Sequence, residues 1–274
     1  NDALNIANNT VLQKSDKKFA SVLIVGLGGS GIGGTIVKDI IASNCSVPVL
    51  STKNYDIPDF VSEKTLVIVS SYSGNTEETI SALKKCIIKS CEIAIITSGG
   101  ELKSIAKQQN YNHIVIPGGN PPRAMFGYSF TVLFHLLNHY NIINFDWQKD
   151  FNDAICLLEK EQKNIKKEAS NLADKLHGKT PVIYATSGFE GVAVRFRQQL
   201  NENSKVLAWH HTVPEMNHNE LLGWRTNTHN LGVIFLRNNC DLQKNQLRID
   251  ISERVISEYS NNITEVWSKG NSII

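Results

Sequence analysis

Residues 22–34, VLIVGLGGSGIGG, decide how this chain folds. Four apolar residues typical of a buried strand run directly into a glycine-rich turn. The apolar residues between Ile32 and Ala42 then recur with helical spacing. A strand, a glycine turn and a helix in that order are the first unit of an α/β fold.

The same alternation continues through the first half of the chain. Short apolar runs predict strands at 66–69, 93–96 and 114–116, and longer amphipathic runs predict helices at 77–87, 102–107 and 126–139. Strands that alternate with helices pair mainly in parallel. We therefore expect an α/β fold with a mainly parallel sheet flanked by helices.

The pattern changes after residue 145 and then restarts. Residues 147–177 are rich in charge and contain no glycine, which predicts a helical connector. Beyond it we expect strands at 182–185, 205–208, 231–235 and 263–267, and helices at 189–203 and 242–259. Both halves open with a strand, a Ser/Gly turn and a helix. We therefore predict two similar subdomains, residues 1–145 and 179–274, joined by a connector at 146–178.

Composition excludes several classes of protein. Among 274 residues, 28 Lys and Arg nearly balance 26 Asp and Glu, and no basic stripe is present, so nucleic acid is not expected as a partner. The five cysteines form no C-x-x-C pair, which favours reduced thiols. No apolar run approaches the ~20 residues that span a bilayer, and the N-terminal residues do not resemble a signal peptide. We expect a cytoplasmic protein that does not enter the membrane.

The glycine turn is a candidate anion site. Backbone N–H groups and the helix dipole favour a phosphate at such a helix N-terminus. The turn also fits G-x-G-x-x-G, but residues 48–52 contain no acidic residue at the end of the next strand, so a dinucleotide site is a weak match. Close packing of helix and strand alone remains an alternative for these glycines.

A second loop, residues 70–79 (SSYSGNTEET), follows the next buried strand. It places the hydroxyls of Ser71, Ser73 and Thr76 around another helix N-terminus, where they can hold a phosphate monoester. Helix capping by Asn75 with Glu78 is the simpler alternative and would account for part of the string. Together with Gly28, Gly29 and Ser30, this loop resembles the sugar isomerase (SIS) domain, which binds phosphosugars through such serines and threonines.

Moving a proton between two carbons of a sugar phosphate needs a base, a ring-opening acid and a positive group beside the enediolate. Arg123, in the proline-stiffened loop GGNPPRA at 118–124, is a candidate for the positive group, and a surface arginine is the alternative. Glu202 lies near a predicted helix C-terminus, where the helix dipole disfavours negative charge and so favours a base. A solvated helix-end glutamate is the competing interpretation.

The segment HHTVPEMNHNE at 210–220 supplies the candidate acid. Histidine exchanges protons near neutral pH, so His218 can open a sugar ring. Three histidines and two glutamates also allow a metal site, but they do not form a recognised ligand spacing. We expect no metal and no cofactor, and we expect His210 and His211 to be structural.

In order along the chain, residues 121–123, 188–189, 201–205 and 214–220 resemble the bifunctional phosphoglucose/phosphomannose isomerases of the SIS superfamily. The resemblance implies interconversion of glucose 6-phosphate or mannose 6-phosphate with fructose 6-phosphate through a cis-enediol. It implies that Glu202 is the base, that Arg123 stabilises the intermediate, and that His218 opens the ring from the other subunit of a homodimer. Substrate-binding residues would be Gly29, Ser30, Ser71, Ser73 and Thr76, the last three chiefly for the phosphate. A non-catalytic phosphosugar sensor that uses the same serines is the alternative.

The resemblance has one departure. Family members continue through closing helices that carry a lysine for ring opening, whereas this sequence ends at Ser272-Ile273-Ile274. Lys269 does not lie in the matching segment. The abrupt apolar ending suggests a fragment whose second subdomain lacks its C-terminal helices.

Overall fold

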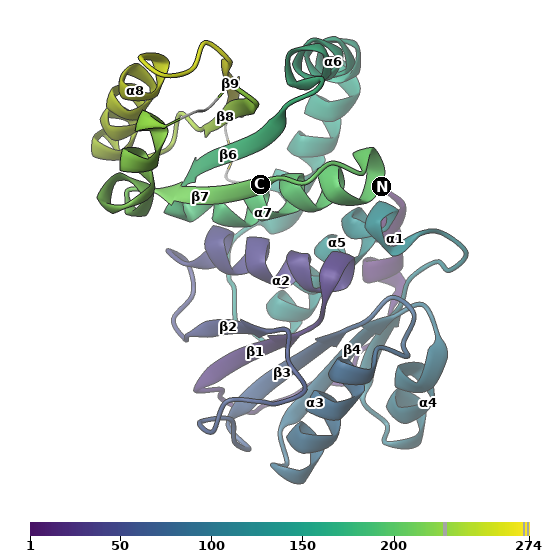
Figure 1. Ribbon diagram of the computed structural model, residues 1–274. Coiled ribbons are helices and arrows are strands. Elements are labelled where there is room, and N and C mark those ends of the chain that lie inside the picture. Colours follow the sequence, from purple (N-terminus) through teal and green to yellow (C-terminus); the bar gives the residue numbers. More distant parts are fainter. Residues whose placement is uncertain (227–228, 271, 273) are drawn as a thin grey trace. The chain divides into compact units, whose positions relative to one another are not determined.

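The computed structural model describes residues 1–226, 229–270, 272 and 274, so Ile273 of the closing segment lies outside the described residues. The chain divides into two compact units, residues 1–147 and 148–274 (Figure 1). No helix in the described part of the chain is both long and apolar enough to cross a membrane.

The first unit is built on a five-stranded sheet in which each pair of neighbouring strands is parallel, in the order β2-β1-β3-β4-β5. Its strands are β1 (Ser21–Val25), β2 (Val49–Thr52), β3 (Thr65–Ser70), β4 (Glu92–Thr97) and β5 (Asn112–Val115). Its helices are α1 (Asp2–Asn9), α2 (Gly28–Ile41), α3 (Glu77–Ile88), α4 (Gly100–Gln108), the 3₁₀ turn η1 (Pro122–Ala124) and α5 (Phe126–His139).

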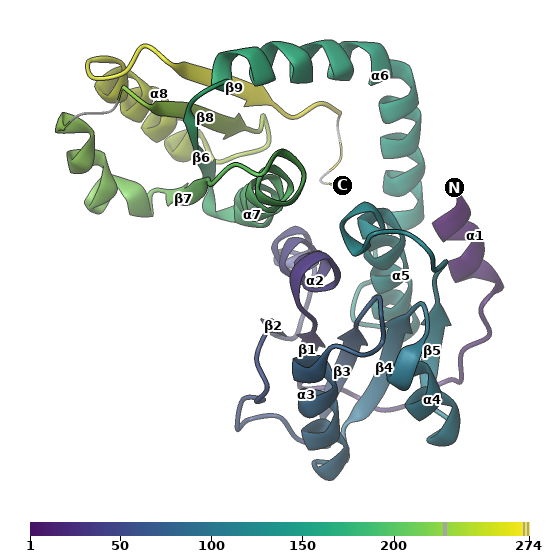
Figure 2. The ribbon, with the colours of Figure 1, turned by 45° about the vertical axis from the view of Figure 1, so that its right-hand side comes forward.

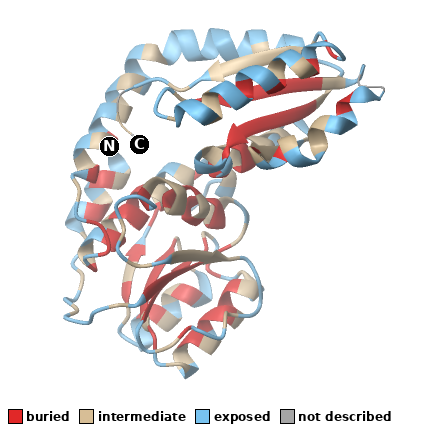
Figure 3. Ribbon diagram, turned by 90° about the vertical axis from the view of Figure 1, so that its left-hand side faces the viewer, coloured by how far each residue is buried: buried red, intermediate tan, exposed pale blue. Residues whose placement is uncertain are grey.

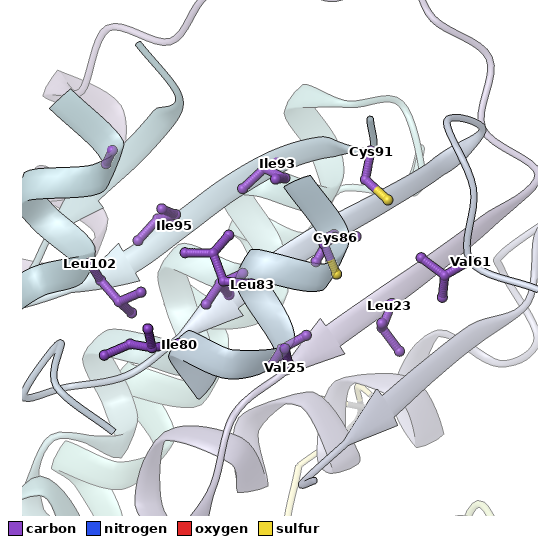
Figure 4. Packing of buried hydrophobic residues seen from close by; sticks show 14 residues of the cluster. Leu23, Val25, Val61, Ile80, Leu83, Cys86, Cys91, Ile93, Ile95 and Leu102 are labelled. Atoms are coloured by element: carbon purple, nitrogen blue, oxygen red, sulfur yellow. The ribbon is translucent and has the colours of Figure 1, made fainter. Parts of the chain in front are cut away.

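Helices cover both faces of this sheet. Helices α3 and α4 lie on one face, and α2 and α5 lie on the other (Figure 2). The apolar cluster under α3 and α4 joins their side chains to those of β1, β3 and β4 (Figure 4). Every residue of β1 and β3 is buried, as expected for parallel strands covered on both sides.

The second unit repeats this plan with four parallel strands in the order β7-β6-β8-β9. Its strands are β6 (Thr180–Thr186), β7 (Trp209–Val213), β8 (Leu231–Arg237) and β9 (Ile263–Trp267). Its helical elements are α6 (Trp147–Leu176), which starts at the last residue of the first unit, η2 (Ser187–Phe189), α7 (Glu190–Gln199), the π-helical η3 (Leu200–Ser204), η4 (Glu215–His218), η5 (Glu220–Arg225) and α8 (Gln243–Ser257). In both units the central strands are the most buried segments (Figure 3).

The predicted fold class is confirmed, since each unit is a parallel sheet flanked by helices. In both units the chain passes from the first strand to an edge strand and then returns to the other side of the first strand. This reversal lies between β1 and β3 in the first unit and between β6 and β8 in the second. Ligands of open parallel sheets bind beside the carboxyl ends of the strands at such a point.

Three details differ from the sequence-based prediction. The strand predicted at 205–208 is wrong, because the strand is β7 and contains His210 and His211. Lys205 adopts a left-handed conformation (φ 58°) that ends η3, and Leu207 is 84% exposed. The single helix predicted at 189–203 is divided into η2, α7 and the π-helical η3. Helix α1 was not predicted.

Candidate functional site

The first candidate anion site is the start of α2, directly after β1. The residue before the helix, Leu27, has an extended backbone, and no described side chain caps the first turn. That turn contains no acidic residue. The N–H of Ser30 already donates to the carbonyl oxygen of Leu27 at 3.1 Å, but the helix dipole still leaves positive potential at Gly28, Gly29 and Ser30.

The second candidate anion site is the start of α3, directly after β3. Thr76 is the N-cap residue, and no described side chain bonds the N–H groups of this helix end. The Oγ of Ser71 lies 2.8 Å from Oγ1 of Thr76 and accepts a 3.2 Å hydrogen bond from the N–H of Gly74. The Oγ of Ser73 accepts the N–H of Asn75 at 3.2 Å. Three hydroxyls therefore gather around an uncapped helix N-terminus.

The capping alternative for this loop is wrong. The side-chain oxygen of Asn75 accepts the N–H of Glu101 at 2.8 Å, in the first turn of α4 rather than of α3. Gly74 makes this arrangement possible, because its φ is +71° and a Cβ there would overlap the carbonyl oxygen of Gly99. The loop after β3 is thus fastened to the loop after β4, and the start of α3 remains open.

The carboxylates in the first turn of α3 would repel an anion if they pointed at it. Glu77 and Glu78 instead interact with Tyr55, in the loop after β2. Desolvation, followed by these two carboxylates, raises the pKa of Tyr55. Both carboxylates therefore lie close enough to the Tyr55 phenol to act on its pKa.

The two loops are bonded to each other and to two further loops through Tyr72. Its N–H donates to Oγ of Ser30 at 2.9 Å, and its carbonyl oxygen accepts the hydroxyl of Ser98 at 2.6 Å. Its phenol oxygen accepts the N–H of Asn120 at 3.0 Å, just before the turn that carries Arg123. Tyr72 therefore links four loops at one edge of the first sheet. Sequence reasoning missed this role, because an aromatic residue in a loop does not reveal its bonding partners.

The Arg123 turn also packs directly against α2. A Cβ on Gly29 would lie 3.1 Å from the carbonyl oxygen of Pro122 and 3.4 Å from the backbone nitrogen of Arg123. The structure therefore brings together all the substrate-binding residues predicted in the first half. These residues are Gly29, Ser30, Ser71, Ser73, Thr76 and Arg123.

The predicted base, Glu202, lies in the second unit on η3, where the chain widens into a π-helix. Single π turns inside helices are frequent at functional sites. The amine of Lys205 bonds the backbone carbonyl of Glu202 and closes the turn. Burial lowers the pKa of Arg195 on α7, and the negative charge of Glu202 opposes that shift. The Glu202 side chain is exposed, and its charge acts on the pKa of the partly buried Arg195.

The predicted acid, His218, is the last residue of η4, also in the second unit. It is exposed, while Met216 before it and Trp224 after it are buried in the core. His210 on β7 is partly buried, and burial, followed by Arg197, lowers the pKa of its ring. Within the described residues, no group of three or more His, Cys, Asp or Glu side chains is placed to hold a metal ion.

Comparison with known proteins shows which fold and which domain class this architecture belongs to. The C-terminal domain of glucosamine-fructose-6-phosphate aminotransferase from Francisella tularensis has the same fold, with a TM-score of 0.71 at 16% identity over 97% of this chain and 80% of that one. Residues 165–274 match the family model described as the bacterial phospho-glucose isomerase C-terminal SIS domain. The fold and this match define an SIS-domain protein.

Two relatives with higher sequence identity show which kind of SIS-domain protein this chain is similar to. The bifunctional phosphoglucose/phosphomannose isomerase of Caldicellulosiruptor bescii is 38% identical over 98% of this chain and 81% of its own length. The D-glucosamine-6-phosphate 4-epimerase of Sulfolobus acidocaldarius is 34% identical over 75% of this chain and 64% of its own length. This chain belongs to the bifunctional phosphoglucose/phosphomannose isomerase family.

Proposed function

We propose that this protein is an aldose–ketose isomerase that interconverts glucose 6-phosphate or mannose 6-phosphate with fructose 6-phosphate. The observation that supports it most is the cluster of Ser71, Ser73 and Thr76 hydroxyls at the uncapped start of α3. Hydroxyl and backbone N–H donors at a helix N-terminus suit the oxygens of a phosphate monoester. A phosphosugar would be held there by its phosphate group.

The chemistry is divided between the two units. In the first, Gly29 and Ser30 contact the sugar, and the positive charge of Arg123 stabilises the enediolate. In the second, His218 protonates the ring oxygen and opens the ring, and Glu202 carries the proton between C1 and C2. Both aldoses differ only at C2 and share one enediol, so a single base serves both.

The enzyme works in the cytoplasm as a homodimer, with no metal or cofactor, and His218 reaches the site of the partner subunit. Mixing two inactive proteins, Glu202→Gln and His218→Ala, tests this geometry. If the two residues act across subunits, one site of each mixed dimer is intact, and about a quarter of wild-type activity returns. If the activity stays at zero although mixed dimers form, the two residues act within one subunit.

A coupled assay with each aldose tests the activity itself. Glu202→Gln keeps the shape of the side chain and removes the base, so kcat should fall by about 10²- to 10⁴-fold. Phosphosugar affinity should be retained, because the proposed phosphate contacts lie in the loop before α3, in the first unit. Glu258→Gln, a change at an exposed carboxylate, is the control and should leave kcat unchanged. Absence of turnover of either aldose by the wild-type protein would contradict the proposal.

The epimerase relative makes C4 epimerisation the second candidate reaction. The same preparation should therefore be incubated with glucosamine 6-phosphate, and the products should be identified by NMR. Inversion at C4 without ketose formation would replace the isomerase proposal. Phosphosugar binding without turnover of any of these substrates would instead indicate a sensor.

A further inference from the structure

A hydrogen-bonded network in the second unit, outside the groups assigned above, centres on Glu220. One carboxylate oxygen, Oε1, accepts the hydroxyl of Tyr184 at 2.5 Å and the indole N–H of Trp209 at 3.2 Å. The other oxygen, Oε2, lies 3.3 Å from Nδ1 of His211, within ion-pair distance but without a hydrogen bond. The indole N–H of Trp224 in turn donates to the hydroxyl of Tyr184 at 2.9 Å. One carboxylate therefore connects β6, β7 and η5.

The network is anchored in the core. Tyr184 is fully buried on β6, an interior strand of the sheet, and its ring packs against Trp224 and Phe235. Burial, and then the carboxylate of Glu220, raises the pKa of Tyr184 far above its usual range. The phenol is therefore a permanent donor at neutral pH, held in one place by the packed rings around it.

Glu220 lies two residues after His218, at the start of η5. Its N–H donates to Oδ1 of Asn219 at 2.5 Å, and its carboxylate makes the contacts to β6 and β7. Helices of the 3₁₀ type are short and have poorer hydrogen-bond geometry than α-helices, so side-chain anchors decide where such a segment sits. Met216 fixes the segment before His218, and Glu220 with Trp224 fixes it after His218.

We propose that Glu220 is a positioning residue that holds the His218 segment for ring opening, an inference that rests on the proposed function. The hydrogen bonds of an ionised carboxylate are roughly twice as strong as those between neutral groups. Removing the carboxylate would leave the buried hydroxyl of Tyr184 without its acceptor and release the start of η5. A displacement of about 1 Å in a reacting group costs about 100-fold in rate.

The test separates ring opening from isomerisation. In a Glu202→Gln background, which cannot move the C1/C2 proton, enzyme-catalysed exchange between the α and β anomers of glucose 6-phosphate is measured by magnetisation-transfer NMR. Adding Glu220→Ala should slow this exchange by about 10- to 100-fold. Glu220→Gln keeps an acceptor for Tyr184 and Trp209 and should retain most of it. Glu258→Ala, at an exposed carboxylate directly after α8 and outside the His218 segment, is the control and should leave exchange unchanged.

A double-mutant cycle with His218→Ala shows whether Glu220 affects anomer exchange through His218. If Glu220 acts through His218, the combined loss should be no larger than that of His218→Ala alone. Additive losses, or unchanged anomer exchange in Glu220→Ala, would overturn the inference. If Glu220→Ala does not fold, Tyr184→Phe, which keeps the packed ring, takes its place with the same expectations. A wild-type protein that catalyses neither exchange nor isomerisation would instead overturn the proposed function.

Discussion

Replacing Gly29 by alanine tests whether the contact between α2 and the Arg123 turn matters for activity. The added Cβ would lie 3.1 Å from the carbonyl oxygen of Pro122, 3.3 Å from its carbonyl carbon and 3.4 Å from the nitrogen of Arg123. Optimal separations between carbon atoms are about 3.5–4.0 Å. The turn must therefore move by a few tenths of an ångström, and the moving atoms are the backbone that carries Arg123.

The expected size of the effect follows from that displacement. A shift of about 1 Å costs roughly 100-fold in rate, so a few tenths of an ångström should lower kcat by about 3- to 10-fold. The serine loop is untouched, so binding of the competitive ligand inorganic phosphate should not change. Helix stability should not fall, because alanine is the better helix former by about 0.5–1 kcal/mol.

Gly33→Ala is the matched control, one turn later on the same helix. Its Cβ would approach only the Cα of Phe130, at 4.0 Å, which is an ordinary contact. Both variants are assayed for kcat and KM with glucose 6-phosphate and for melting temperature. Equal kcat in Gly29→Ala and Gly33→Ala would refute the argument that this contact sets the position of Arg123.

Two further predictions concern Tyr72 and Glu253. Tyr72→Phe removes the acceptor of the Asn120 N–H, so the free energy of unfolding should fall by about 1 kcal/mol. The variant should also lower kcat more than it raises KM. Thermal melting and steady-state kinetics check this, and an unchanged kcat would count against it. Desolvation and then Glu265 raise the pKa of Glu253, so the stability associated with its protonated form is present at low pH and lost as the pH rises through that pKa. Glu253→Gln should therefore raise the melting temperature at pH 7 by about 1–3 °C. This increase is small because solvent screening keeps the gain in the free energy of unfolding below about 1 kcal/mol. The increase in melting temperature should vanish near pH 4. The control Glu258→Gln should show no such pH dependence, and a gain in Glu253→Gln that persists at pH 4 would exclude this origin.

Much of the fold was predictable from local signals. The strand, glycine turn and helix at residues 22–41 were recognised because apolar periodicity and glycine depend on a residue and its neighbours in sequence. The same reasoning failed at residues 205–208, where three apolar residues suggested a strand. The real strand is β7, since its pairing with β6 places Trp209 beside Val182, and that partner lies far away in the sequence.

Some features of the candidate site were likewise predictable from local sequence, and others were visible only in the folded structure. The sequence alone determined that hydroxyls cluster after β3 and that glycines open α2, because each motif is a continuous string beside a helix start. Only the tertiary structure decided that Asn75 caps α4, that Tyr72 joins four loops and that Glu220 connects three segments. These bonds join residues that are far apart in the sequence, and their spacing along the chain does not determine how they lie in space. Their partners are determined by which strands lie side by side, and that order is a property of the folded sheet.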